Sequence, residues 1–328
     1  MSGLGEFERI ARFFTPLVEG QSDALGLTDD AALVTPPAGK RMAVTADALV
    51  AGVHFLPDDP ADRVARKALR VNISDLAAMG AEPYGYTITL ALPRDMADAE
   101  AWIERFARGQ AEDHAEYGIR LLGGDSVSTP GPLSISITAF GWVPSDQALT
   151  RGGARPGDDI YVSGTIGDSF LGLAVLQGDD FDLAESERAF LTDRYHLPQP
   201  RPRLGLALLG VTGTALDVSD GLLQDLGHIC EVSKVGAEVE LSLVPFSGSG
   251  QRLVAAGRVP AGDLVTGGDD YELLFTAPES ARSAVFEHAG KTGIPVTRIG
   301  KIRAGDGVDL LDQSGKIMAL GRRGYTHA

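Results

Sequence analysis

The alternation of hydrophobic and polar positions predicts helices and strands mixed along the whole chain of 328 residues. Apolar residues recur every three to four positions over 61–79 and 98–117, which predicts two amphipathic helices. Leu133, Ile135 and Ile137 share one face of a predicted strand at 133–143. The remaining elements of this half are a helix at 6–14 and strands at 42–45, 84–92 and 120–122.

A turn-rich segment at 145–159 separates this half from a second α/β layer structure. It contains Gly152, Gly153, Pro156 and Gly157, which are typical of a connection. We therefore place a domain boundary there and expect domains at 1–148 and 149–328. Beyond it, strands are predicted at 159–163, up to 217, and at 238–243, 271–276 and 295–299, and helices at 167–177, 185–195, 202–209 and 221–233.

Composition narrows the class of protein. With 44% hydrophobic residues, the chain is long enough to bury two cores. Its net charge of −16, from 45 acidic and 29 basic residues, disfavours binding to nucleic acid or to anionic membranes. No stretch approaches the roughly 20 apolar residues of a membrane helix, and the N-terminus lacks the apolar core of a secretory signal. We expect a cytoplasmic protein without a membrane partner.

The single cysteine, Cys230, excludes an internal disulfide and a thiolate metal cluster. Its apolar neighbour Ile229 indicates a buried position in a helix. The six histidines show no zinc-type spacing, and no Ser–His–Asp or Cys–His nucleophile motif is present. His54 is more often expected as a packed histidine than as a ligand.

Six short segments place aspartate beside glycine, serine or threonine where strands are expected to end. They are 28–30, 45–47, 74–75, 123–126, 217–221 and 267–270. Carboxylates presented from loops on a rigid scaffold suit hard divalent cations. For any one segment a turn or a helix cap is the simpler explanation.

Asp75 differs from the others because it lies on the apolar stripe of a predicted helix, with Val64, Ala68, Val71 and Ala78. A buried carboxylate must be protonated, paired with a basic side chain or bound to a cation. A salt bridge to Arg66 or Arg70 and a metal ligand are therefore the two alternatives.

Two of the segments suit phosphate as well as metal. In 217–221 a strand ends in a tight turn into a helix, so Asp220 is either the N-cap or, with Asp217, a metal ligand, and Ser219 would then contact a phosphate oxygen. Gly124 lets backbone approach a phosphate closely, and Asp125 would supply a metal ligand beside it.

Taken together, these segments favour phosphoryl transfer assisted by several Mg²⁺ ions. A chain with no Gly-rich loop ending in Lys-Ser/Thr is not a P-loop NTPase. An acceptor that already carries a phosphate is an anionic nucleophile and needs no general base, which fits the absence of an obvious base.

Seven segments together resemble the thiamine-monophosphate kinase family, in the same order and over nearly the whole chain. They are DDAAL at 29–33, DALVAGVHF at 47–55, NISDLAAMGA at 72–81, GGD at 123–125, ALTR at 148–151, DVSDGL at 217–222 and GGDDYEL at 267–273. The wider superfamily includes aminoimidazole ribonucleotide synthetase, selenophosphate synthetase and a hydrogenase-maturation enzyme. Segment 47–55 indicates the thiamine branch.

The resemblance implies a two-domain aminoimidazole ribonucleotide synthetase-like fold of mixed α/β type. The N-terminal domain, with a mixed sheet, would bind ATP and Mg²⁺ and join its sheet to that of a second copy in a homodimer. The C-terminal α/β domain would close the cleft. The implied reaction is direct in-line transfer from ATP to thiamine monophosphate, giving ADP and thiamine diphosphate in thiamine diphosphate biosynthesis.

The resemblance also implies roles for individual residues. The metal ligands would be Asp30, Asp47, Asp75, Asp125, Asp217 and Asp220, with Thr45 and the backbone of Ala46. ATP would contact Tyr117, Gly124, Asp125, Arg151 and Ser219. Arg151 and the metals would stabilise charge on the transferring group. The substrate would meet His54, Asp269 or Glu272, and Arg322.

Four positions depart from the family pattern: Thr28 replaces glycine, Ala46 replaces threonine, Asp269 replaces glutamate, and Arg322 stands near a tryptophan of some members. One alternative is a sister ATP-dependent synthetase that uses the same aspartates with a different acceptor pocket. The other is a non-catalytic cation- or nucleotide-binding protein, which the changes at Thr28 and Ala46 leave open. Selenophosphate synthetase is disfavoured because Cys230 lies far from the N-terminal loop where that chemistry needs a cysteine.

Overall fold

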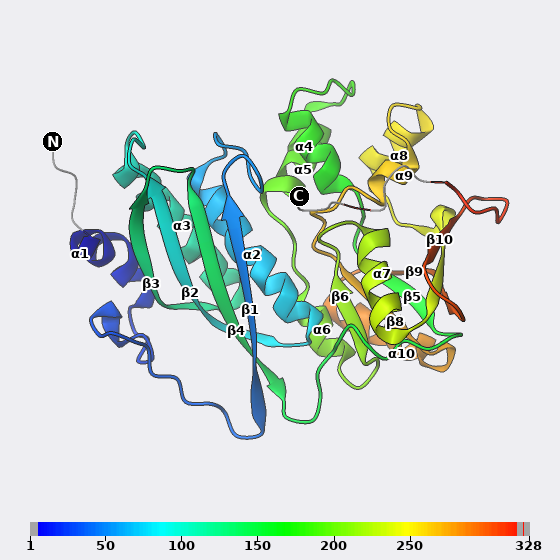
Figure 1. The fold of residues 1–328 in the computed structure, drawn as a ribbon, viewed down its shortest axis with the longest axis horizontal. Coiled ribbons are helices and arrows are strands. Elements are labelled where there is room, and N and C mark those ends of the chain that lie inside the picture. The colour runs from blue at the N-terminus through cyan, green and yellow to red at the C-terminus, as the bar shows by residue number, and fades with distance from the viewer. Residues whose placement is uncertain (1–5, 320–323, 325–328) are drawn as a thin grey trace. The chain divides into compact units, whose positions relative to one another are not determined.

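The computed structural model describes residues 6–319 and 324, and the chain forms two compact units. Unit 1 comprises Met1–Leu76 and Glu82–Ser145, and unit 2 comprises Ala77–Ala81 and Asp146–Ala328. Each unit has its own β-sheet (Figure 1). Among the described residues, no helix combines the length and the apolar character that crossing a membrane requires.

Unit 1 contains a four-stranded sheet in the order β1-β4-β2-β3. Its strands are β1 (Lys40–Val50), β2 (Glu82–Pro93), β3 (Arg120–Thr129) and β4 (Ser134–Pro144). β2 and β3 run parallel, whereas β4 is antiparallel to both β1 and β2. Strands β1 and β3 therefore form the two edges of the sheet.

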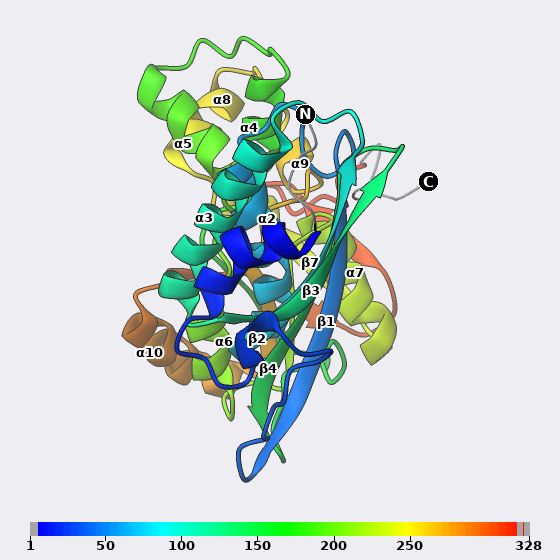
Figure 2. The same ribbon diagram turned by 90° about the vertical axis from the view of Figure 1, so that its left-hand side faces the viewer.

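Helices α2 (Ala61–Ala78) and α3 (Ala99–Tyr117) cover one face of this sheet, as Figure 2 shows. Buried side chains of the sheet include Ile88, Leu90 and Ile137. The N-terminal segment forms short turns of helix instead of the single predicted helix at 6–14: α1 (Glu6–Arg9), a π-helix (Ile10–Phe14) and 3₁₀ helices (Thr15–Val18 and Leu25–Leu27).

Unit 2 contains a six-stranded sheet in the order β10-β7-β9-β5-β8-β6. Its strands are β5 (Asp159–Ser163), β6 (Thr214–Asp217), β7 (Gly236–Glu240), β8 (Leu273–Ala277), β9 (Val296–Arg303) and β10 (Val308–Leu311). Its helices are α4 (Asp168–Leu176), α5 (Glu185–His196), α6 (Pro202–Leu208), α7 (Leu222–Ser233), α8 (Gly248–Ala255), α9 (Ala261–Leu264) and α10 (Arg282–Thr292). Short 3₁₀ helices occupy Leu241–Leu243 and Glu279–Ala281.

Two apolar clusters hold α6, α7 and α10 against the sheet. Leu226 and Ile229 of α7 belong to one cluster, and Leu204 of α6 and Val285 of α10 belong to another. Cys230 in α7 is a free cysteine with 3% of its surface exposed, which confirms the predicted buried helix position.

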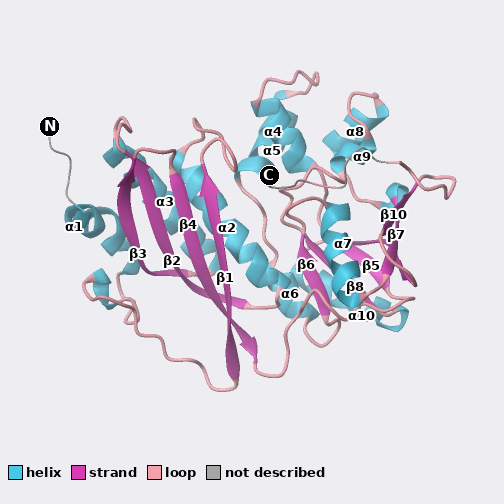
Figure 3. Ribbon diagram, in the orientation of Figure 1, coloured by secondary structure: helices cyan, strands magenta, loops and turns pink. Residues whose placement is uncertain are grey.

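Figure 3 shows the helices and strands of the structure, and the predicted elements agree with them best where the apolar period is long. The helices predicted at 61–79 and 98–117 are confirmed to within one residue at each end. Several strands differ: β1 runs from Lys40 to Val50, β3 continues to Thr129 instead of ending at 122, and β7 ends at Glu240. Strand β9 continues to Arg303 instead of ending at 299, and β10 was not predicted. Glycine at 123 and 124 concealed the length of β3, because it is unfavourable in strands.

Candidate active site

Asp47 and Asp75 bring two carboxyl groups together between β1 and α2. Thr45 and Asp47 point to the same side of β1, being two residues apart, and the hydroxyl of Thr45 donates a hydrogen bond to Asp75 Oδ2. Burial, the charge of Asp75 and a hydrogen bond between the two carboxyls, in that order, raise the pKa of Asp47 from 3.8 to about 6. Two carboxylates this close repel one another unless a proton or a cation lies between them.

The sequence offered Asp75 a salt bridge to Arg66 or Arg70 as one alternative. In the structure both arginines turn towards α3. Arg70 donates to both carboxylate oxygens of Asp113, from Nε at 2.9 Å and from Nη2 at 2.9 Å, and to Glu116 at 2.6 Å. Arg66 donates from Nε to Asp113 at 2.8 Å. Arg66 and Arg70 thus pair with carboxylates of α3, whereas the carboxylate of Asp75 meets Thr45 and Asp47.

A cavity of about 540 Å³ lies beside the edge strand β3. Asp29, Asp30, Gly123, Gly124 and Asp125 are among its lining residues. The carboxylates at 29, 30 and 125 are exposed. The cavity is thus open to ligands and carries several carboxylates at its wall, and its volume is typical of small-molecule sites.

Gly123 and Gly124 in this wall differ in the room that surrounds them. A Cβ at Gly124 would lie 2.0 Å from the carbonyl oxygen of Ile88 on β2, so glycine is needed there for β2 and β3 to pair. A Cβ at Gly123 would meet nothing within 4 Å. Backbone at Gly123 is therefore open to the predicted close approach of a phosphate, and at Gly124 packing against β2 is a second reason for glycine.

The strand order separates predicted metal ligands that the sequence placed in one set. Asp47 lies on edge strand β1 and Asp125 on the opposite edge strand β3. Three strand spacings separate these edges, about 14 Å across the sheet. Ala46 is exposed and faces away from Thr45 and Asp47. Within one copy of unit 1, the candidate ligands therefore form two groups, one with Asp75 and one with Asp30.

His54 and Tyr117 are held by contacts within unit 1. The Nδ1 atom of His54 accepts the backbone N–H of Val50 at 3.0 Å, which folds the ring over the turn that follows β1. The guanidinium carbon of Arg70 lies 5.1 Å from the centre of the Tyr117 ring, a cation–π contact. Both side chains are half-buried, so each keeps a surface that a ligand could contact.

In unit 2, the two predicted acidic segments lie side by side at one end of the sheet. Asp217 ends β6 and is 4% exposed, while Ser219 and Asp220 follow in the turn and are half-buried. The backbone N–H of Asp269 donates to the carbonyl of Ser219 at 2.7 Å. Asp269 itself adopts a left-handed conformation, with φ of 64°, which is uncommon outside glycine. The structure thus brings Asp269 next to the 217–221 turn.

The structure corrects the expectation for Glu272, whose carboxylate is fully buried. Arg201 donates to it from Nε at 2.7 Å and from Nη2 at 2.5 Å, Arg194 donates at 2.9 Å and the hydroxyl of Ser163 at 2.6 Å. In this arrangement no surface of Glu272 is open to a substrate. Arg151 is exposed, as a contact to ATP requires, and Arg322 lies outside the described residues.

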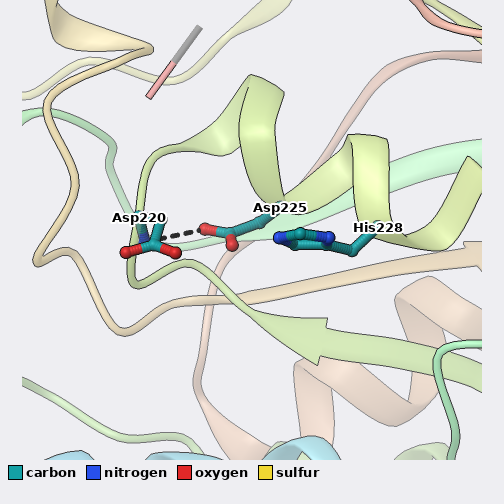
Figure 4. A group of neighbouring side chains, drawn as sticks. All are labelled: Asp220, Asp225 and His228. Carbon is teal, nitrogen blue, oxygen red and sulfur yellow. Dashed lines mark hydrogen bonds between the residues drawn. The ribbon is translucent and has the colours of Figure 1, made fainter. Parts of the chain in front are cut away.

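Sequence reasoning missed Asp225 and His228, which Figure 4 shows beside Asp220. One potential ligand atom from each of the three lies within 4.8 Å of the others. Burial, followed by the charge of Asp220, raises the pKa of Asp225 to about 7. The signal in the sequence was an aspartate in the first turn of a helix, where backbone N–H groups lack partners within the helix.

Comparison with known proteins gives consistent matches over both halves. Residues 28–143 match the family model of the AIR synthase related protein, N-terminal domain, and residues 155–313 match that of the C-terminal domain. The thiamine-monophosphate kinase of Escherichia coli (strain K12) is 45% identical over 327 residues, covering 98% of each chain.

Two solved structures are similar over almost the full length. A crystal structure of thiamine-monophosphate kinase from Stenotrophomonas maltophilia K279a has a TM-score of 0.84 at 42% identity, covering 96% of this chain and 98% of that one. A ThiL structure in complex with AMPPCP and TMP has a TM-score of 0.78 at 30% identity, covering 100% and 99%. The two-domain α/β architecture predicted from the sequence is thereby confirmed.

Proposed function

The chain belongs to the thiamine-monophosphate kinase family of AIR synthase related proteins, and we propose that it transfers the terminal phosphoryl group of ATP to thiamine monophosphate. An oxygen of the acceptor phosphate forms a bond to the terminal phosphorus of ATP, and the bond from that phosphorus to the bridging oxygen of ADP breaks. The products are ADP and thiamine diphosphate. The similar structure with AMPPCP and TMP supports this choice of nucleotide and acceptor.

The observation that carries the proposal is the Asp47–Asp75 pair. Its carboxyls meet at a partly buried position, where the hydroxyl of Thr45 also donates to Asp75. Two carboxylates and the hydroxyl of Thr45 form an all-oxygen donor set of the kind that Mg²⁺ prefers. We propose that these residues hold Mg²⁺, which when bound would neutralise negative charge on the phosphates.

The remaining acidic residues suit the same chemistry. Asp30 and Asp125 would hold further Mg²⁺ at the cavity beside β3, where Gly123 leaves room for a phosphate. In unit 2, Asp217 and Asp220 would hold Mg²⁺, and the hydroxyl of Ser219 would donate to a phosphate oxygen. Dense countercharge is what two polyanionic reactants need in order to approach each other.

Other residues would position the reactants. Arg151, an exposed cation, would pair with phosphate oxygens of ATP and stabilise charge that develops during transfer. The half-buried ring of Tyr117, together with the backbone of Gly124, would contact the nucleotide. His54 would face the acceptor phosphate, and Asp269 would lie near the thiazole or pyrimidine of thiamine.

We also propose a cytoplasmic homodimer that forms through unit 1. On edge strand β1, Met42 and Val44 lie two residues apart on the face of the sheet opposite α2 and α3, and they are 41% and 58% exposed. Exposed apolar side chains that lie side by side on a sheet face are typical of an interface. Sedimentation of the wild type and of a Val44→Lys variant tests this: the variant should be monomeric, and two identical dimers would contradict the interface.

The experiment that tests the function is an assay of product formation with ATP and Mg²⁺. The acceptors to compare are thiamine monophosphate, thiamine and aminoimidazole-pathway substrates, with the product identified by mass spectrometry. Thiamine diphosphate formed only from the monophosphate supports the proposal. Turnover of another acceptor would indicate a sister enzyme, and nucleotide binding without turnover on any acceptor would indicate a binding protein.

A further inference from the structure

Asp225 binds the backbone of the turn that carries Ser219 and Asp220. Its Oδ2 atom accepts three consecutive backbone N–H groups, from Ser219 at 3.0 Å, Asp220 at 3.0 Å and Gly221 at 3.1 Å. Figure 4 shows the carboxylate pointing from α7 towards this turn. The residue is 4% exposed, so these hydrogen bonds are shielded from water.

This arrangement argues against Oδ2 of Asp225 as a metal ligand, although the residue lies close to Asp220 and His228. Three N–H groups converging on one point present positive partial charge and form a concavity that binds an anion. The carboxylate of Asp225 fills that concavity. A cation approaching Oδ2 would compete with all three donors, and a phosphate would have to displace the carboxylate.

The opposite side of the same turn is also held by hydrogen bonds. The N–H of Asp269 donates to the carbonyl of Ser219, and the N–H of Tyr271 donates to the carbonyl of Val218, both at 2.7 Å. At Gly221, φ is 121° and a Cβ would lie 3.0 Å from the backbone of Thr266, so the turn fits closely against this neighbour. The turn is thus fixed on one side by a single side chain and on the other by backbone.

From this geometry we infer that Asp225 is a positioning residue for phosphoryl transfer. By accepting the three N–H groups it fixes the direction in which the side chains of Ser219 and Asp220 leave the turn. The inference rests on the proposed function, in which these two side chains contact phosphate and Mg²⁺. Misplacing a contacting group by about 1 Å can lower a rate on the order of 10²-fold.

The chemistry of the contact gives a discriminating pair of variants. A single oxygen accepts all three N–H groups, so an asparagine whose amide oxygen takes that place keeps the acceptor and loses only the charge. Alanine loses the acceptor. We expect Asp225→Asn to retain kcat within about threefold, and Asp225→Ala to lose on the order of 10²-fold in kcat and to need more Mg²⁺ for half-maximal rate.

Asp159 supplies the matched control, because it is a fully buried aspartate of unit 2 that pairs with Arg282 at 2.8 Å. It begins β5, opposite Ala277 at the end of β8 that is remote from the turn. We expect Asp159→Ala to lower the midpoint of unfolding but to keep kcat per folded molecule and the Mg²⁺ dependence. All rates are to be measured well below each variant's unfolding midpoint.

Amide hydrogen exchange of 219–221 provides a readout that does not depend on turnover. We expect protection of these amides in the wild type and in Asp225→Asn, and fast exchange in Asp225→Ala. The positioning role would be overturned if the wild type is active and Asp225→Ala equals it in kcat, in Mg²⁺ dependence and in the protection of amides 219–221. Equal loss in the asparagine and alanine variants would overturn it in favour of a charged ligand. A wild type that forms no thiamine diphosphate refutes the proposed function instead, whatever the exchange shows.

Discussion

Replacing Asp75 by asparagine separates a metal ligand from a structural carboxylate. The change keeps the size of the side chain and an oxygen that can accept from Thr45, but it removes one of two negative charges that meet between β1 and α2. We therefore expect phosphoryl transfer to fall by 10²–10³-fold or more, which is typical of removing one stabilising group from a transition state. The fold should remain intact.

The magnitude for stability follows from the pKa of Asp47, which is raised from 3.8 to about 6. This difference corresponds to about 3 kcal/mol of folding free energy. Because the pKa of Asp47 is raised in the folded protein, protonation of this carboxyl stabilises the fold. The stabilisation is fully present below pH 3.8 and is lost as the pH rises through 6. Burial is the largest cause and the charge of Asp75 the second, so Asp75→Asn should restore only part of this folding free energy at pH 7.5 without Mg²⁺.

Urea unfolding at pH 4.5 and 7.5, with EDTA or with Mg²⁺, measures this effect beside the kinetic assay. Asp75→Asn should be at least as stable as the wild type at pH 7.5 in EDTA and should gain less from Mg²⁺. Asp113→Asn is the contrast, because Asp113 is fully buried between Arg66 and Arg70 and its loss should cost about 3–5 kcal/mol. Full activity in Asp75→Asn, or a loss of stability like that of Asp113→Asn, would refute the assignment.

Three further substitutions test other parts of the account. Glu272→Gln removes the carboxylate that two arginines share and should cost about 3–5 kcal/mol in urea unfolding; a raised KM for thiamine monophosphate at unchanged stability would instead show a substrate contact. Gly124→Ala places a Cβ 2.0 Å from the Ile88 carbonyl and should cost about 1–3 kcal/mol and raise the KM for ATP; an unchanged KM would contradict a nucleotide site beside β3. Arg151→Ala should lower kcat/KM about tenfold or more with an unchanged unfolding midpoint, and wild-type kinetics would exclude Arg151 from the site.

Periodicity predicted the elements whose side chains alternate regularly between core and solvent. The stripe on α2 placed Asp75 on an apolar face, and in the structure its neighbours Val64, Ala68 and Val71 are buried. The same pattern left the partner of Asp75 open, because helix spacing does not show which way an arginine turns. That choice depended on Asp113, a residue of another helix.

The site was harder to predict wherever tertiary pairing decides the role of a residue. Glu272 stands in an acidic, glycine-rich segment typical of a ligand loop, yet Arg194, Arg201 and Ser163 enclose it, and they lie 71 to 109 residues away in the sequence. The distance between Asp47 and Asp125 depends on strand order, which the hydrophobic pattern of single strands does not encode.

Asp225 illustrates the converse case, in which an ordinary residue of a helix start gains a role from the neighbouring turn. Aspartate in the first turn of a helix is common, because it complements the helix dipole and the free N–H groups. Only the three distances to the turn distinguish it from such a residue.

The most direct test of the central claim is the mass of the product formed from ATP, Mg²⁺ and thiamine monophosphate. We predict thiamine diphosphate and ADP in equal amounts, no product from unphosphorylated thiamine, and no product when EDTA removes the metal. Thiamine diphosphate formed equally well in EDTA would contradict the metal sites. ADP released without thiamine diphosphate would contradict the proposed function.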